Sequence, residues 1–134
     1  MGDIFRDDRH CFVCGERNTF GLQLSPEGKD GRGTIVWLPD KRHQGFDGVV
    51  HGGLISTLID EAMAYAAMSE EGFSVTAGIS VRFRRPVEVG EQVRVEAELV
   101  GRRGRMLELQ ASVIQNGEEK ASGTGTFVRV DSGK

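Results

Sequence analysis

The chain is poor in the residues that define disulfide-built, membrane-spanning or strongly charged proteins. Its 134 residues include two cysteines, and its formal net charge is −3. Two cysteines cannot build the disulfide framework of a small secreted domain. The small net charge gives no reason to expect nucleic acid or a membrane surface as a partner. No apolar run approaches the roughly 20 residues needed to span a bilayer.

The N-terminus, "MGDIFRDDRH", is polar and does not resemble a secretory signal, so we expect a soluble, cytoplasmic protein. The length fits a single domain, residues 1–134, that is large enough to bury a core. We expect residues 1–19 to be irregular. No internal repeat, linker or low-complexity tract interrupts the rest.

The hydrophobic pattern predicts a single long helix followed by a sheet. Two short strands, "FGLQL" (20–24) and "TIVWL" (34–38), are expected first, with "SPEGKDGRG" as the turn between them. Residues 39–50 are expected to form a loop. From about residue 52 to 68, apolar residues recur at helical spacing around most of the circumference, as in a helix covered by other elements.

After the helix the period changes to two, which predicts four consecutive strands. In "FSVTAGISVRF" (73–83), alternation places Ile79 and Phe83 on one face and Thr76 on the other, together with Gly78 and Ser80. Three further alternating segments follow, at 93–100, 106–115 and 120–130. The expected order is β-β-α-β-β-β-β, an α+β domain with one buried helix against an antiparallel meander.

The start of the helix, "GVVHGGLISTLIDEAM" (48–63), carries the chemistry. A helix N-terminus offers free N–H groups and a positive dipole end, and a glycine such as Gly52 lets a ligand approach closely. Downstream, Asp60 lies among apolar residues, where a carboxylate can serve as general base or nucleophile. Together they could attack an activated carbonyl. The structural alternative is a flexible glycine pair and a solvated acid. Glu61, about 100° further around the helix, is interpreted as structural or peripheral.

The spacing of these groups requires two chains if they share one site. Gly52 and Asp60 are eight residues apart, roughly 12 Å along a helix. One carbonyl cannot lie about 3 Å from both. Two antiparallel helices, one from each subunit of a two-fold dimer, would pair each N-terminus with the acid of the other chain.

The runs "HGGLISTLIDEAMAYAA" and "FSVTAGISVRFRRPVEVGEQV" resemble the hotdog-fold acyl-CoA thioesterases, in particular the branch of the phenylacetate-pathway and 4-hydroxybenzoyl-CoA thioesterases. The resemblance extends from "CFVCGERNTFGLQL" to the last strand. It implies a hotdog fold, in which a sheet wraps the long helix, and a homodimer that can pair into a tetramer. It also implies hydrolysis of an acyl-CoA without a cofactor, because coenzyme A is part of the substrate.

The resemblance also assigns roles to individual residues. It implies that Asp60 is the catalytic acid, acting as nucleophile or as base for a water, and that the Gly52 N–H, together with Gly53, polarises the thioester carbonyl. His51 would orient the loop and the substrate, and Thr76 would position the attacking water. Several relatives carry an Asn six residues before the motif histidine. Here that residue is Gly45, so either Gln44 supplies the amide or the role is absent.

The remaining candidates concern substrate binding and the cysteine pair. Gly78 and Ser80 are candidates to line the pantetheine channel, and Arg84 and Arg85 are candidates to bind coenzyme A phosphates. The alternative for the arginines is pairing with nearby glutamates. The "CFVCG" pair has metal-site spacing, but a closed zinc site needs four ligands and no second pair exists. We therefore expect no metal, and we interpret the pair as packing at a strand edge.

Two other functions remain open for such a chain. A non-catalytic acyl-CoA or acyl-chain sensor could use the same fold, but it would not need an acid beside the carbonyl. A hotdog dehydratase would need a catalytic histidine paired with a helix acid of the opposite subunit. His51 is the only histidine within the helix motif. The pattern thus favours the hydrolase.

Overall fold

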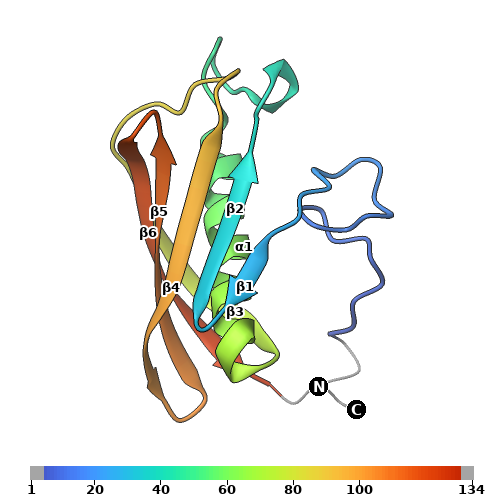
Figure 1. Cartoon of the computed structure of the whole chain (residues 1–134), viewed down its shortest axis with the longest axis vertical. Coiled ribbons are helices and arrows are strands. Elements are labelled where there is room, and N and C mark those ends of the chain that lie inside the picture. Colours follow the sequence, from blue (N-terminus) through green and yellow to red (C-terminus); the bar gives the residue numbers. More distant parts are fainter. Residues whose placement is uncertain (1–4, 131–134) are drawn as a thin grey trace.

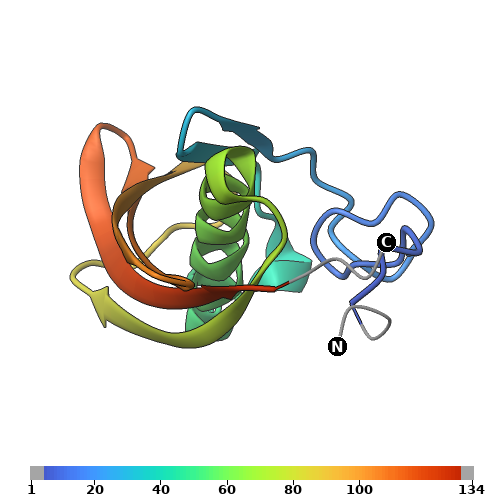
Figure 2. The ribbon, with the colours of Figure 1, turned by 90° about the horizontal axis from the view of Figure 1, so that it is seen from below.

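A single long helix lies inside a curved antiparallel sheet in the computed structural model, which describes residues 5–130. The helix, α1 (Gly52–Glu71), runs along the concave side of the sheet (Figures 1 and 2). The sheet order is β1-β2-β4-β5-β6-β3. The strands are β1 (Glu27–Lys29), β2 (Arg32–Trp37), β3 (Ser74–Phe83), β4 (Val93–Arg103), β5 (Met106–Gln115) and β6 (Glu118–Arg129). The predicted order β-β-α-β-β-β-β is confirmed, and the arrangement is that of a hotdog.

The helix fits the sheet because small residues line the contact on both sides. Seven helix residues are buried: Ile55, Leu58, Ile59, Ala62, Met63, Ala66 and Ala67. A side chain on Gly33 of β2 would lie 2.1 Å from the carbonyl oxygen of Ala62, so only glycine permits this approach. Gly125 of β6 similarly leaves room for Met63. The buried carbon surface of this interface is the main stabilising term of the fold.

The expectation of a strand at 20–24 is wrong. Leu22 and Leu24 each donate a backbone hydrogen bond to the Phe12–Val13 stretch, at 2.8 Å, but Gln23 between them has a φ of 53° and breaks an extended strand. The first strand is instead β1, which forms within the predicted turn and pairs with β2. Residues 5–26 carry no helix or strand, and residues 1–4, which belong to the segment expected to be irregular, lie outside the described residues.

The strand β3 forms one edge of the sheet and contains a bulge that changes which side chains face the helix. Its pairing with β6 shifts between Thr76 and Gly78, so Ala77 has no partner. Directly paired residues lie on the same face. Thr76 pairs with the fully buried Phe127, and Ile79 pairs with Gly125, which faces the helix. Thr76 and Ile79 therefore share the inner face, and simple alternation placed Thr76 wrongly.

The loop between β2 and α1 leads into the N-terminus of the helix. It includes one turn of 3-10 helix, η1 (Lys41–His43), and two isolated bridges, Gln44 with Val50 and Val49 with Glu88. The latter bridge joins this loop to the connection between β3 and β4. Among the described helices, none is long and apolar enough to span a membrane.

Candidate active site

The two residues expected to activate a nucleophile lie in hydrogen-bond contact. The Thr76 hydroxyl donates to Asp60 Oδ1 at 2.7 Å, which joins the inner face of β3 to the middle of α1. The bulge at Ala77 makes this contact possible, because it turns Thr76 toward the helix. The bond uses one oxygen of the half-buried carboxylate. Asp60 is thereby fixed in orientation while Oδ2 is left for another partner.

The N-terminus of α1 has a side-chain cap that leaves one backbone N–H without an acceptor. His51 is the N-cap of α1, and its Nδ1 accepts the Gly53 N–H at 2.9 Å. The ring proton of a neutral His51 is then on Nε2. Within residues 5–130, no group accepts the N–H of Gly52. Gly52 therefore presents a free donor at the positive end of the helix dipole, whereas the N–H of Gly53 is occupied.

The free donor opens into an apolar pocket of about 960 Å³. His51, Gly52 and Gly53 form part of its wall. The apolar part of the wall comes from the preceding loop, the helix and the end of β3: Phe46, Val49, Ile55, Phe83, Pro86 and Val87. Phe46 is 84% and Phe83 is 54% exposed, so the pocket mouth is a large uncovered hydrophobic area. This is the kind of surface that an acyl chain or a second subunit would cover.

Asp60 and Thr76 do not line this pocket. Asp60 lies eight positions after Gly52 along the helix, roughly 12 Å away. Within one chain the structure thus forms two half-sites, the carboxylate with its hydroxyl and the helix N-terminus with its pocket.

Three of the other candidates do not line the pocket at the helix N-terminus. Gly78 and Ser80 lie on the outer face of β3, because they pair with Thr126 and Thr124, and they line a shallow hollow away from α1. Gln44 accepts the Gly48 N–H at 3.1 Å and so closes its own loop instead of lining the pocket.

The two arginines border the pocket, but their side chains are engaged with β6. Arg84 lies 3.3 Å from Glu119 and Arg85 lies 3.3 Å from Glu118, measured between Nε and Oε2. Both arginine side chains are more than half exposed, so the two ion pairs contribute little stability. Each arginine can therefore readily exchange its glutamate for another anion. Binding of a phosphate by either arginine would require that exchange.

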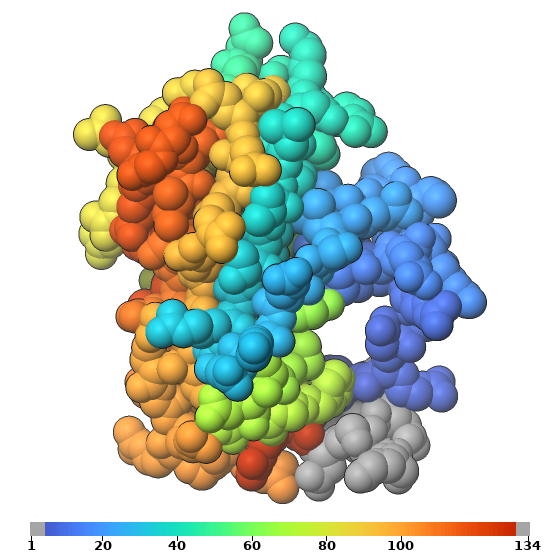
Figure 3. Space-filling view, viewed as in Figure 1, coloured from blue at the N-terminus to red at the C-terminus, as the bar shows by residue number. Residues whose placement is uncertain are grey.

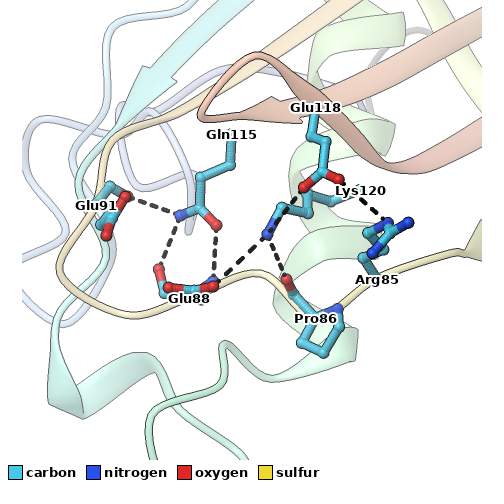
Figure 4. A network of polar contacts seen from close by, with 7 residues as sticks. All are labelled: Arg85, Pro86, Glu88, Glu91, Gln115, Glu118 and Lys120. Atoms are coloured by element: carbon cyan, nitrogen blue, oxygen red, sulfur yellow. Dashed lines mark hydrogen bonds and ion pairs between the residues drawn. The ribbon is translucent and has the colours of Figure 1, made fainter.

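Two buried polar residues of the sheet, which the sequence pattern did not indicate, hold the segment that forms part of the pocket wall (Figure 4). Gln115 accepts the Glu88 N–H at 2.9 Å and donates to the carbonyls of Glu88 and Glu91. The ammonium of Lys120 donates to the Pro86 carbonyl at 3.0 Å. Both residues are at most 4% exposed. Their partners come from a different part of the chain, so periodicity could not identify them.

On the side of α1 next to Asp60, Glu61 contacts the two cysteines. The pair lies on a turn that packs against the helix, with Cys11 touching the core, and not at the edge of a strand. Burial raises the pKa of Glu61, partly offset by its contact with Cys14, and the charge of Asp60 adds to the rise. Burial and then the contact with Glu61 raise the pKa of the Cys14 thiol to about 12.

Comparison with known proteins assigns the family. The model of the thioesterase superfamily matches residues 47–122, which cover α1, β3, β4, β5 and the start of β6. The chain belongs to the thioesterase superfamily, and its fold is the hotdog fold. The crystal structure of a thioesterase superfamily protein superimposes with a TM-score of 0.83 and 28% identity, over 90% of this chain and 61% of that chain.

Among curated relatives, the acyl-coenzyme A thioesterase THEM4 of Mus musculus is 34% identical over 94 residues, which are 68% of this chain and 40% of that protein. The 3-hydroxyacyl-[acyl-carrier-protein] dehydratase FabZ of Thermus thermophilus is 36% identical over 88 residues, 58% of this chain and 62% of that protein. The chain thus spans less than two thirds of either relative.

Proposed function

We propose that the chain is an acyl-CoA thioesterase that hydrolyses its substrate to a free acid and coenzyme A at a site shared by two subunits. The observation that carries the proposal is the Asp60–Thr76 contact at 2.7 Å together with the free N–H of Gly52 on the same helix. A carboxylate held by a hydroxyl and an unused donor at a helix N-terminus are the two parts that attack on a thioester needs. The THEM4 relationship supports the choice of substrate.

The reaction follows from these two groups. Asp60 of one subunit removes a proton from a water, and the water oxygen bonds to the thioester carbonyl carbon. The negative charge that develops on the carbonyl oxygen is stabilised by the Gly52 N–H of the partner copy. The carbon–sulfur bond then breaks, and the thiolate of coenzyme A leaves with the proton that Asp60 took from the water, which restores the carboxylate. Thr76, whose proton is donated to Asp60, keeps lone pairs with which to accept a hydrogen bond from that water.

Two features of the chain favour a dimer that joins the half-sites. The strand β3 is a free edge of the sheet, and Ile79 and Phe83 on it are 39% and 54% exposed. Free edges and exposed apolar patches are usually covered in a stable protein. Phe83 also lies against Gly52, so a copy that pairs along β3 approaches the helix N-terminus. Whether such dimers pair again into tetramers does not affect the site.

The test of the function is thiol release from a panel of aromatic and short to long aliphatic acyl-CoAs, with free coenzyme A trapped by a thiol reagent. We expect turnover of at least one member. Binding of acyl-CoA without thiol release would instead identify a sensor. The panel includes a 3-hydroxyacyl-CoA, whose conversion to an enoyl product without thiol release would identify a dehydratase, the reaction named for the FabZ relative. Either outcome would contradict the proposal.

The Thr76 hydroxyl is expected to act by holding Asp60 and the attacking water in place. Thr76→Val keeps the shape of the side chain but removes the hydrogen bond, and a bond to a charged group is worth about 1.5–3 kcal/mol. We therefore expect kcat to fall about 10- to 100-fold. KM should change little, because no contact of Thr76 holds the acyl group. Thr76→Ser, which restores the hydroxyl, should recover most of kcat. Equal losses in the two variants would exclude a role for the hydroxyl.

A further inference from the structure

The cysteine turn and the middle of the helix bring three metal-ligating side chains together. The Sγ atoms of Cys11 and Cys14 and a carboxylate oxygen of Glu61 all lie within 4.8 Å of one another. Both oxygens of Glu61 are 3.9 Å from Cys11 Sγ. A tetrahedral zinc with Zn–S of about 2.3 Å and Zn–O of about 2.1 Å sets sulfur and oxygen about 3.6 Å apart. The separations in the cluster, 4.8 Å or less, would shorten by about 1 Å at most to bring the three ligands to tetrahedral spacing.

The turn that carries the cysteines is shaped to present both sulfurs on one side. The Val13 N–H donates to Cys11 Sγ at 3.4 Å, and the Gly15 N–H donates to the Cys11 carbonyl at 2.9 Å. A side chain on Gly15 would lie 2.3 Å from the Cys11 nitrogen, so the turn closes only with glycine. An N–H directed at sulfur stabilises a metal-bound thiolate, as outer-shell hydrogen bonds do in metal sites.

Glu61 also lacks the cation that a half-buried carboxylate needs. Throughout residues 5–130, no Lys, Arg or His forms an ion pair with it. Glu71, on the same helix and 6% exposed, is by contrast paired with Arg102 and Arg129. Glu61 lies next to a second carboxylate, Asp60, which increases the unfavourable charge. A bound divalent cation would supply the missing positive charge.

We propose that Cys11, Cys14 and Glu61 form a binding site for a zinc-class divalent cation. Thiolate ligands select zinc over magnesium or calcium, and three protein ligands leave the fourth position to a water. The cysteines belong to the N-terminal segment and Glu61 to α1, fifty residues further along the chain. The cation would tie this segment to the helix turn that carries Asp60. Figure 3 shows the segment (blue) as an arm, part of which stands off the helix (green). A bound cation would add a second attachment between this arm and the helix.

The experiment is a zinc titration of the reduced full chain, kept in a phosphine reductant and competed against a chromophoric chelator. We expect one zinc per chain. Loss of a direct ligand should weaken binding by more than the roughly 10- to 100-fold typical of an outer-shell contact, so Cys11→Ser, Cys14→Ser and Glu61→Gln should each weaken it at least 100-fold. Glu70→Gln, the same change on an exposed residue of the same helix, is the matched control and should bind zinc as the wild type does.

Cobalt substitution gives a second readout that does not depend on the variants folding equally well. Cobalt bound by the two thiolates should show a sulfur-to-metal charge-transfer band that is absent from both cysteine variants. The proposal is overturned if the reduced chain binds no zinc, if zinc binding survives Glu61→Gln, or if the cobalt spectrum lacks the thiolate band. A Cys11–Cys14 disulfide that persists in the reductant would also overturn it. Thiol release is measured on the same samples, so failure here does not bear on hydrolysis.

Discussion

Asp60→Asn is expected to reduce thiol release from acyl-CoA by about 10²- to 10⁴-fold, the contribution of a positioned general base. The substituted side chain keeps an oxygen that accepts the Thr76 hydroxyl, now found at 2.7 Å, so the link between β3 and α1 is preserved. What it loses is the negative charge that takes a proton from water. We therefore expect kcat to fall while the affinity for a non-hydrolysable acyl-CoA analogue stays close to that of the wild type.

Asp30→Asn is the matched control for this variant. Asp30 lies in the exposed turn between β1 and β2 with a φ of 52°, a conformation that asparagine adopts readily. Wild-type turnover in this control and a near-total loss in Asp60→Asn would show that the effect belongs to one carboxylate. If Asp60→Asn released thiol at the wild-type rate, the proposed base would be wrong, whatever the substrate.

The sequence predicted the elements whose side-chain period is regular. Apolar residues around the circumference at 52–68 indicated a buried helix, and period-two alternation indicated the four strands that follow. The errors arose where a single residue interrupts a period. Gln23 at positive φ breaks the expected strand at 20–24, and the unpaired Ala77 turns Thr76 to the helix face. Alternation cannot show a bulge, because an inserted residue changes the pairing and not the pattern of residue types.

The sequence was enough to name the candidate residues of the site, but not to predict which of their side chains contact one another. Glycine at a helix start and an acid in the helix interior are local features, and their spacing along α1 follows from helix geometry alone. That His51 occupies the Gly53 N–H depends on a side-chain rotamer at the cap. The contact of Glu61 with Cys11 joins residues fifty positions apart. Such long-range contacts require the fold, and the interpretation of Glu61 as structural or peripheral was made without them.

Gly52→Pro is expected to reduce kcat about 10²- to 10³-fold, the usual cost of one oxyanion donor. Proline fits the first position of a helix, where its missing N–H breaks no helical bond. The preceding residue must be extended, and His51 already has φ −59° and ψ 130°. Gly52→Ala is the matched control, because it keeps the N–H and its methyl would lie 3.5 Å from the Phe83 ring, an ordinary contact. A fall in both variants alike would point to crowding of the pocket.

Joining the two inactive variants in one dimer should restore activity. Asp60→Asn and Gly52→Pro chains carrying different tags are co-expressed, and the mixed dimer is isolated through both tags. In that dimer the Asp60 of the Gly52→Pro chain faces the intact Gly52 of its partner, while the second site has lost both groups. One working site of two predicts about half of the wild-type activity per dimer. If donor and base acted within one chain, each chain would still lack one of them and the mixed dimer would stay inactive. Recovery of activity therefore requires that each active site combine the base of one subunit with the donor of the other.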